Sequence, residues 1–264
     1  MKFVDSFIAR FSGYPASLES TLNSFVPYKT DFPLVRLGGE GDGAYLVPND
    51  LEDIDGAISL GCGQNIQFEQ DLYDKTGVTS VIVDSSESFP ENFKDTPHTF
   101  LHGWIGEFAP PINQELPIYN LPSVLEKAGK ERILNGLLKV DIESSEYSLL
   151  LGTNLDMLRQ FRIIIVEFHR LNELKTSSIF CRILDEILRK FGKEFVVCHF
   201  HPNNAVKFFQ VGKTLFPSCV EVTFLRKDRS LENYMRFGDY PKEMDIQNDA
   251  VRSVIPVTFP VQIV

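Results

Sequence analysis

The sequence of 264 residues is short of positive charge, with 26 Lys and Arg against 36 Asp and Glu and a net charge of -10. A sequence-independent grip on nucleic acid needs clustered Lys and Arg, so nucleic acid is disfavoured as a partner. No apolar run approaches the roughly 20 residues of a membrane span. The first residues, MKFVDSFIARF, lack the long apolar centre and cleavage site of a signal peptide. We therefore expect no membrane span and a cytoplasmic protein.

Paired cysteines are also missing. The four cysteines, Cys62, Cys181, Cys198 and Cys219, are widely spaced and form no CxxC pair. Such spacing gives no sign of a disulfide framework or a cysteine-based zinc site. Buried thiols are the expected state.

Short apolar runs that end in glycine, acid or histidine recur along the chain, with helical stretches between several of them. This alternation is typical of an α/β sheet with mostly parallel strands. We expect one domain over 1–264, with helices in 1–35 that cover or pack on the sheet and an irregular tail at 228–264. The predicted strands are 56–63, 79–86, 98–106, 136–143, 161–169 and 194–201, with an antiparallel or edge strand at 219–227, and the clearest helix is 177–192.

Polar residues stand at the ends of these runs, where ligands bind in an open parallel sheet. Taken singly, each has an ordinary explanation: a turn, a helix cap, favourable charge at a helix N-terminus, or a core histidine. Together they recur at one edge, which a cap or turn does not require. They are Gly61, Gly63, Asp84, Asp141, Glu143, Glu167, His169, His199 and His201.

The interval from Gly61 to Asp84 suits a nucleotide-like ligand. Glycines allow close backbone approach, and an acid about 20 residues later accepts hydrogen bonds from ribose hydroxyls. The third glycine of the GxGxxG fingerprint is absent after Gly63, where QNIQFE follows. A ligand without a pyrophosphate therefore fits better, although this spacing alone does not separate a dinucleotide from S-adenosylmethionine.

Five ordered blocks between Arg36 and Asn204 carry a family resemblance: RLGGEGDGAYLVP, AISLGCGQNIQFEQDL, LLKVDIESSEYSLL, IIIVEFHRL and VCHFHPNN. Together they resemble the FkbM-type methyltransferases. The resemblance implies a Rossmann-like class I methyltransferase fold, with a mostly parallel seven-stranded sheet and helices on both faces. It also implies methyl transfer from S-adenosylmethionine, often to sugar hydroxyls. Two positions depart from the family pattern, Ala44 and Ser144, and serine at 144 is strained if its φ is positive.

The resemblance also implies roles for individual residues around the cofactor. Gly61 and Gly63 would pass close to its methionine part and Asp84 would bind its ribose. Arg36, Asp42 and Gly43 would close over it, with Arg36 pairing with its carboxylate. Trp104 and Ile105 would lie near the adenine.

Transfer to a sugar hydroxyl needs a general base or a metal to carry the developing charge. Asp141 stands where cofactor and acceptor would meet, with His169 or His201 as base or ligand. We expect a divalent cation such as Mg²⁺ or Mn²⁺ on Asp141, Glu167 and His201. The alternative makes His201 itself the base and leaves Glu167 to orient a histidine. Asn203 and Asn204 offer amides for sugar hydroxyls.

Two other functions stay open at this point. A nicotinamide-dependent oxidoreductase uses the same class of sheet, and a non-catalytic S-adenosylmethionine-binding module would keep the pocket without the reaction. The expected partner is a small-molecule or glycan substrate, with a protein or lipid acceptor as an alternative. The oligomeric state is open, a homo-oligomer included.

Overall fold

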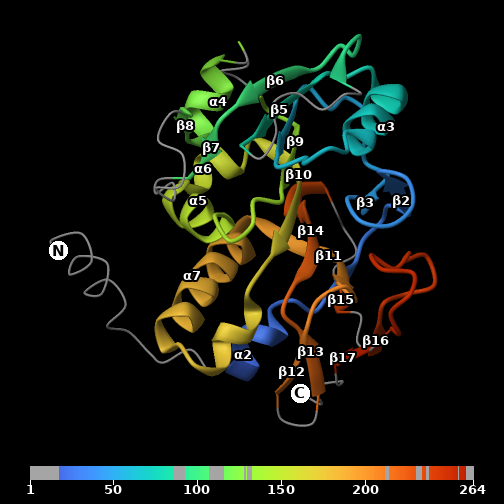
Figure 1. Cartoon of the computed structure of the whole chain (residues 1–264), viewed down its shortest axis with the longest axis vertical. Helices are drawn as coiled ribbons and strands as arrows, with labels where there is room; N and C mark the ends of the chain where they lie inside the picture. Colours follow the sequence, from blue (N-terminus) through green and yellow to red (C-terminus); the bar gives the residue numbers. More distant parts are fainter. Residues whose placement is uncertain are drawn as a thin grey trace, which may run out of the picture.

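The computed structural model describes residues 18–85, 93–106, 116–127, 129, 133–211, 214–229, 234–235, 238–254 and 256–259. Its centre is a seven-stranded sheet in the order β11–β14–β10–β9–β4–β5–β6 (Figure 1). The strands are β4 (Ala57–Leu60), β5 (Ser80–Asp84), β6 (Thr99–His102), β9 (Gly136–Val140), β10 (Phe161–Phe168), β11 (Phe195–Pro202) and β14 (Val220–Arg226). Six of them fall within the predicted runs, and β11 extends one residue beyond its run, to Pro202.

The sheet is mixed rather than wholly parallel. The pairs β4–β5, β5–β6, β4–β9 and β9–β10 are parallel, whereas β14 runs antiparallel to both of its neighbours, β10 and β11. The prediction of an antiparallel strand at 219–227 is confirmed, but the edge position is wrong because β14 lies inside the sheet. As a result, the start of β14 meets the carboxyl ends of β10 and β11.

The two faces of the sheet are covered differently. On one face, the strands pack against α2 (Leu18–Asn23), α4 (Leu121–Lys127), α5 (Glu146–Gly152) and α7 (Ser178–Glu194). On the other, they pack against α3 (Gln67–Thr76) and the hairpin of β2 (Leu34–Leu37) and β3 (Tyr45–Pro48). Figure 1 shows α7 and this hairpin on opposite sides of the sheet. Helices cover both faces as expected, with the hairpin sharing the second.

This division follows from the alternation of side chains along each strand. Ile164 and Val166 of β10 point to the first face, and Ile163 and Ile165 to the second. Because both faces are buried, every residue of β10 is buried, which explains its continuous apolar run. The next residue on the second face is Glu167, which therefore points towards the hairpin.

The longest helix, α7, begins where its sequence predicts. Ser177 precedes it and accepts a hydrogen bond from the Phe180 amide, which satisfies a free donor at the helix N-terminus. The predicted end at Gly192 is too early, since the helix continues to Glu194 and leads directly into β11. Across the described ranges, no helix is long and apolar enough to cross a membrane.

The remaining elements are short. Within 1–35, the structure describes α2 and β1, and residues 1–17 of the predicted helical segment lie outside the described residues. Within 228–264, it describes short strands and part of a 3₁₀ turn. The other elements are β1 (Tyr28–Lys29) paired with β15 (Tyr234–Met235), β7 (Trp104–Ile105) with β8 (Ile118–Tyr119), β12 (Phe208–Val211) with β13 (Thr214–Pro217), β16 (Gly238–Tyr240) with β17 (Val257–Phe259), α6 (Leu155–Leu158), and the 3₁₀ turns Leu171–Lys175 and Lys227–Arg229.

Candidate active site

Two predicted acids meet beneath the hairpin. The buried Tyr45 of β3 donates hydrogen bonds from its hydroxyl to Asp141 Oδ2 at 3.1 Å and to Glu167 Oε2 at 3.4 Å. Asp141 follows β9 and Glu167 is near the end of β10, so parallel pairing of these strands sets the two carboxylates side by side. The Asp141 side chain is 26% exposed and the Glu167 side chain only 7%. Asp141 is thus the acid that an incoming ligand can reach.

His169 sits among four carboxylates. Its backbone N–H donates to Glu146 Oε1 at 2.9 Å, and its Nδ1 lies 3.3 Å from the same oxygen. Its Nε2 faces Glu167 Oε1 at 3.6 Å, Glu143 Oε2 at 3.7 Å and Asp141 Oδ1 at 3.8 Å. The buried Glu146 thus fixes the ring from one side and leaves the other nitrogen pointing at three acids.

The pKa values of this group reflect burial and crowding of like charge. Burial and then the neighbouring carboxylates of Asp141 and Glu221 raise the pKa of Glu167 well above its usual range. Burial alone would lower the pKa of His169, but Glu146, Glu167 and Asp141 outweigh it and raise the pKa to about 10. The site therefore holds more negative charge than its own cations balance.

The antiparallel strand adds residues that sequence reasoning missed. Cys219, just before β14, lies with its Sγ 2.9 Å from Glu167 Oε1 and donates a hydrogen bond to it. Glu221 is the register partner of Glu167 on one side and of His201 on the other. The sequence pattern points to residues at the ends of strands, whereas these two residues stand at the start of a strand that runs the other way.

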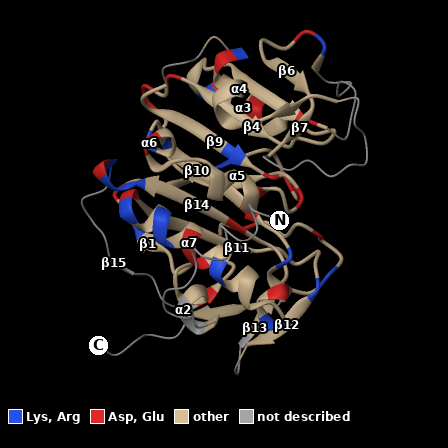
Figure 2. Ribbon diagram, turned by 90° about the vertical axis from the view of Figure 1, so that its left-hand side faces the viewer, with Lys and Arg blue, Asp and Glu red and all other residues tan. Residues whose placement is uncertain are grey.

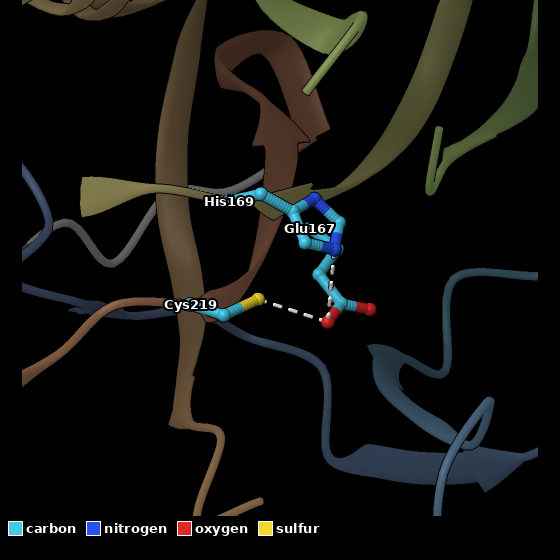
Figure 3. A group of neighbouring side chains, drawn as sticks. All are labelled: Glu167, His169 and Cys219. Carbon is cyan, nitrogen blue, oxygen red and sulfur yellow. Dashed lines mark hydrogen bonds and ion pairs between the residues drawn. The ribbon is translucent and has the colours of Figure 1, made fainter. Parts of the chain in front are cut away.

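Figure 3 shows Glu167, His169 and Cys219 converging from two neighbouring strands. Their ligand atoms lie within 4.8 Å of one another, as do those of Asp141, Glu143 and His169. His201 belongs to neither group among the described residues. The structure therefore brings together Asp141 and Glu167 of the predicted metal ligands, and it places His169 in the position where His201 was expected.

Gly61 and Gly63 form a loop after β4 that is braced from two sides. Asp84 Oδ2 accepts hydrogen bonds from the backbone N–H groups of Cys62 at 2.7 Å and Gly63 at 2.8 Å. A Cβ at Gly61 would lie 1.7 Å from the Asp141 carbonyl oxygen, whereas nothing lies within 4 Å of one at Gly63. Gly61 thus joins the loop to the acid cluster, and Gly63 borders open space that a cofactor can enter.

A buried ion pair supports this loop from below. Lys139 Nζ donates to the Gly61 carbonyl at 2.9 Å and lies 3.4 Å from Glu69 Oε1, with 2% and 0% of the two side chains exposed. Ser59 also donates to Glu69. Burial lowers the pKa of Lys139, but Glu69 and Asp141 outweigh it and the net shift is upward, so the lysine stays charged. Sequence reasoning missed both residues because each lies inside an apolar pattern.

The predicted cofactor residues Arg36 and Asp42 contact the C-terminal segment 241–252, which we call the strap. Arg36 donates to the Met244 carbonyl at 2.8 Å. Asn248 donates to Asp42 Oδ1 at 3.1 Å and to Glu221 Oε1 at 2.6 Å, and its Oδ1 lies 2.9 Å from His201 Nε2. The strap therefore ties the hairpin loop to β14 and β11.

The predicted substrate residues Asn203 and Asn204 are both buried, and their amides bond within the chain. Asn203 Nδ2 donates to Glu167 Oε1 at 3.3 Å. Asn204 Nδ2 donates to the carbonyls of Asp249 at 2.7 Å and Arg252 at 3.1 Å, and its Oδ1 accepts the Asp249 N–H at 2.9 Å. Asn204 can meet a substrate only when the strap moves, and its role in substrate binding stays a prediction.

The predicted adenine residues lie in β7, directly after β6. Ile105 is buried in the main core, while Trp104 is half-buried and donates its backbone N–H to the Pro117 carbonyl at 2.8 Å. The other predicted loop residue, Gly43, has a φ of +81° in the turn between β2 and β3. The roles of these three residues in cofactor binding stay predictions.

The turn after Asp141 contains backbone strain at Ser144, the serine that departs from the family pattern. Ser144 has a φ of +82° and Glu143 a φ of +50°. Residues with a side chain rarely adopt this region, and the cost is about 1–2 kcal/mol for each. The turn is nevertheless formed, and it places Glu146 at the start of α5 against His169.

Basic residues gather at the opposite edge. Arg162 and Arg229 both bond Asp50, and Arg226 donates to the Arg159 carbonyl, where β10 and β11 begin. Figure 2 shows a group of basic positions on the left side of the view, near β1. Because the acids lie at the carboxyl edge, that edge attracts cations rather than phosphates.

The strap should loosen as the pH rises. His199 Nε2 and His201 Nδ1 lie 2.9 and 3.3 Å from Asp245 Oδ1. Burial would lower the pKa of His201, but Glu221, Asp245 and Asn248 raise it to about 9. Burial would raise the pKa of Asp245, but the two histidines hold it well below its usual range.

The direction of the pH effect on stability follows from these pKa shifts. Because the pKa of His201 is higher in the folded protein, its protonation stabilises the fold fully below about pH 6.5, and this stabilisation is lost as the pH rises through 9. The depressed Asp245 contributes above about pH 4. Burial also raises the pKa of Glu221 to about 7, so its ionisation lowers stability as the pH rises from about 4.5 to 7, before His201 loses its proton.

We expect trypsin to cleave after Lys242 and Arg252 slowly at pH 6 and faster at pH 9, with rates normalised to the denatured chain at each pH. The Asp245→Asn variant should be cleaved quickly at both. Equal normalised rates for the parent protein at the two pH values would contradict this attachment.

Comparison with protein families decides the assignment. A model of the FkbM methyltransferase domain matches residues 38–211, more than half of the chain. The chain belongs to the FkbM methyltransferase family. The matched segment contains the glycine loop, Asp84, Asp141 after β9 and Glu167 near the end of β10, while Cys219, Glu221 and the strap lie beyond it.

No curated protein matches the chain. Among solved structures it is similar to the pyocyanin biosynthetic protein PhzM, with 11% identity, a TM-score of 0.23 and 66% of this chain covered. The match spans 51% of that chain, about half its length, and its low score supports no argument about the fold or the site.

Proposed function

We propose that this protein transfers a methyl group from S-adenosylmethionine to a hydroxyl group of a sugar, nucleotide sugar or glycan precursor. The observation that carries the proposal is the contact between the Gly61 loop and Asp141. This contact supports a cofactor site next to the partly exposed carboxylate of Asp141. Methyl transfer requires this adjacency, because the donor carbon and the acceptor oxygen must be aligned within a few ångströms.

The residues present fit S-adenosylmethionine. The loop has open space at Gly63, where a glycine is needed for close approach. Asp84 is held at the loop by two backbone amides, which supports a role for its carboxylate in accepting hydrogen bonds from ribose hydroxyls. The cofactor would supply an electrophilic methyl group, and its positive sulfonium suits an edge rich in carboxylates.

Asp141 is the residue that we assign to proton removal from the acceptor. It is more exposed than Glu167, and Tyr45 orients both carboxylates from below. Glu167 and His169 lie deeper and supply charge around the reacting atoms. His201, predicted as a base or ligand, is held by Asp245 and Asn248 and would act only after the strap is displaced.

The family assignment favours methyl transfer over the nicotinamide oxidoreductase that the sequence left open. A non-catalytic binding module remains the second candidate, since Asn204 and His201 are covered by the strap. Turnover separates the two. Mass spectrometry of nucleotide sugars and glycan precursors incubated with the protein and cofactor should show an added methyl group on oxygen. Methylation of nucleic acid alone would contradict the proposal.

Cofactor binding should depend on Asp84. At a hundredfold excess over Kd, a ligand that binds only the folded state adds about 2.7 kcal/mol, which raises the melting temperature by roughly 5 °C or more. We expect this increase with S-adenosylmethionine or its demethylated product, little with NADH, and almost none in the Asp84→Ala variant.

Asp55 offers a matched control, because it also accepts two backbone amides, those of Leu134 and Asn135, but at the other edge of the sheet. Asp55→Ala should lower stability and keep the ligand-induced increase. If both variants lose the ligand-induced rise in melting temperature equally, Asp84 supports the loop structurally and does not bind the cofactor.

A further inference from the structure

The Nε2 atom of His169 lies in an environment that needs a cation. Three carboxylate oxygens face it at 3.6–3.8 Å. These separations are too long for hydrogen bonds. Two ligands held about 2.0–2.2 Å from one ion at tetrahedral angles stand roughly 3.3–3.6 Å apart. The Glu167 oxygen, at 3.6 Å, reaches the upper end of this range, whereas the Glu143 and Asp141 oxygens, at 3.7 and 3.8 Å, lie just beyond it.

The other ring nitrogen is already fixed. Glu146 Oε1 faces Nδ1 at 3.3 Å and is itself fully buried and held by the His169 backbone N–H. A carboxylate on Nδ1 keeps a ring proton there, so Nε2 is the nitrogen that can give up its proton and bind an ion. Histidine ligands in metal sites have this arrangement, in which a carboxylate orients the ring from behind.

Cys219 completes a set of three donors. Its Sγ, the Glu167 Oε1 and the His169 Nε2 lie within 4.8 Å of one another, and Cys219 and Glu167 are buried (Figure 3). Asn203 donates to Glu167 from the side at 3.3 Å and restrains that carboxylate. One sulfur, one nitrogen and one oxygen ligand favour a borderline ion such as Zn²⁺ over the hard Mg²⁺.

We propose that Glu167, His169 and Cys219 form a binding site for a divalent transition metal ion, with zinc the ion that fits the donors best. On binding, the Sγ–H bond of Cys219 and the Nε2–H bond of His169 break, metal–sulfur and metal–nitrogen bonds form, and both protons leave to solvent. Three protein ligands leave a fourth position open, as in catalytic zinc sites. That position faces Asp141, whose Oδ1 is 3.8 Å from His169 Nε2.

This site revises the set of ligands predicted from the sequence. His169 replaces His201, Cys219 is added, and Asp141 moves from ligand to the residue beside the open position. Where the proposed function holds, an acceptor hydroxyl would occupy that position and lose its proton to Asp141. Metal binding itself does not depend on methyl transfer, so the two proposals can fail separately.

Cobalt provides the test, since Co²⁺ occupies zinc sites and a thiolate ligand gives it a strong near-ultraviolet charge-transfer band. The full chain, stripped with a chelator and shown by its melting curve to remain folded, is titrated with Co²⁺ without S-adenosylmethionine. We expect saturation at one ion per chain, appearance of that band, and displacement of cobalt by Zn²⁺ with a rise in melting temperature.

Variants assign the ligands. Cys219→Ser should abolish the charge-transfer band, and His169→Gln should weaken cobalt binding about 100-fold or more. Cys198→Ser is the matched control, because Cys198 is also buried but donates to the Thr223 carbonyl, and it should leave the band unchanged. Cys62→Ser controls for the half-buried thiol of the glycine loop and should also leave it unchanged.

Three results would overturn the proposal: no band at saturating cobalt, a band that survives Cys219→Ser, or a band lost in Cys62→Ser. Stabilisation by Mg²⁺ that does not depend on Cys219 would overturn it as well, and would leave the acids predicted from the sequence as the site. The proposed function is judged independently, by the melting shift with S-adenosylmethionine in the same stripped protein.

Discussion

Replacing Gly61 by alanine is expected to destabilise the protein by about 3 kcal/mol or more and to abolish cofactor binding. The new Cβ would lie 1.7 Å from the Asp141 carbonyl oxygen and 2.7 Å from its carbon, and the φ of +83° adds strain. Both contacts are with backbone, so no side chain can move aside. The loop must separate from the segment that carries Asp141, and the cofactor and acceptor positions separate with it.

Gly63→Ala is the matched control two residues later. Its φ of +52° is also positive, but nothing lies within 4 Å of the added Cβ. We expect a loss of about 1 kcal/mol from the backbone alone. Urea denaturation gives the stability of each variant, and calorimetric titration with S-adenosylmethionine gives the affinity. Similar stabilities for the two variants would show that the contact with Asp141 does not require glycine.

Replacing Lys139 by methionine is expected to cost about 3–5 kcal/mol, because it leaves the carboxylate of Glu69 buried without its partner. Glu69 Oε2 already has no hydrogen-bond partner within the described part of the chain, so Lys139 and Ser59 hold the carboxylate through Oε1 alone. Removing both charges in a Lys139→Met/Glu69→Met variant should recover most of the loss, since no buried charge then remains.

The double variant separates the two tasks of the lysine. It should recover stability but not cofactor affinity, because the hydrogen bond from Lys139 Nζ to the Gly61 carbonyl stays lost. Denaturation of the parent, the two single variants and the double variant gives the coupling energy. If the stability losses of the two single variants simply add in the double variant, the two residues act independently. If the double variant binds S-adenosylmethionine with full affinity, Lys139 is not needed to support the loop.

The candidate site was only partly visible in the sequence. Asp141, Glu167 and His169 were found because each follows a long apolar run, and in parallel strands such positions share one edge. Tyr45, Lys139 and Glu69 were not found, because an aromatic residue in a hairpin and charges inside apolar patterns look like packing or a solvated helix face. Their roles depend on which elements face each other across the sheet.

His201 shows the limit of reasoning from strand ends. It does end a predicted strand at the expected edge, yet β14 lies between β11 and β10, and its Glu221 separates His201 from Glu167. The strap then supplies Asp245 and Asn248 as partners. Neither the insertion of β14 nor the return of a segment more than 40 residues later leaves a local signal in the sequence.

The sequence by itself determined the strands, the main helices, the glycine loop and the edge at which polar residues gather, because these depend on local periodicity and on residues that terminate strands. The tertiary structure decided the order of the strands, the direction of β14 and the cover provided by the hairpin and the strap. Those features bring Cys219 to Glu167 and Tyr45 to Asp141 through pairings between distant segments, which are fixed by packing of the whole core rather than by local residue preference.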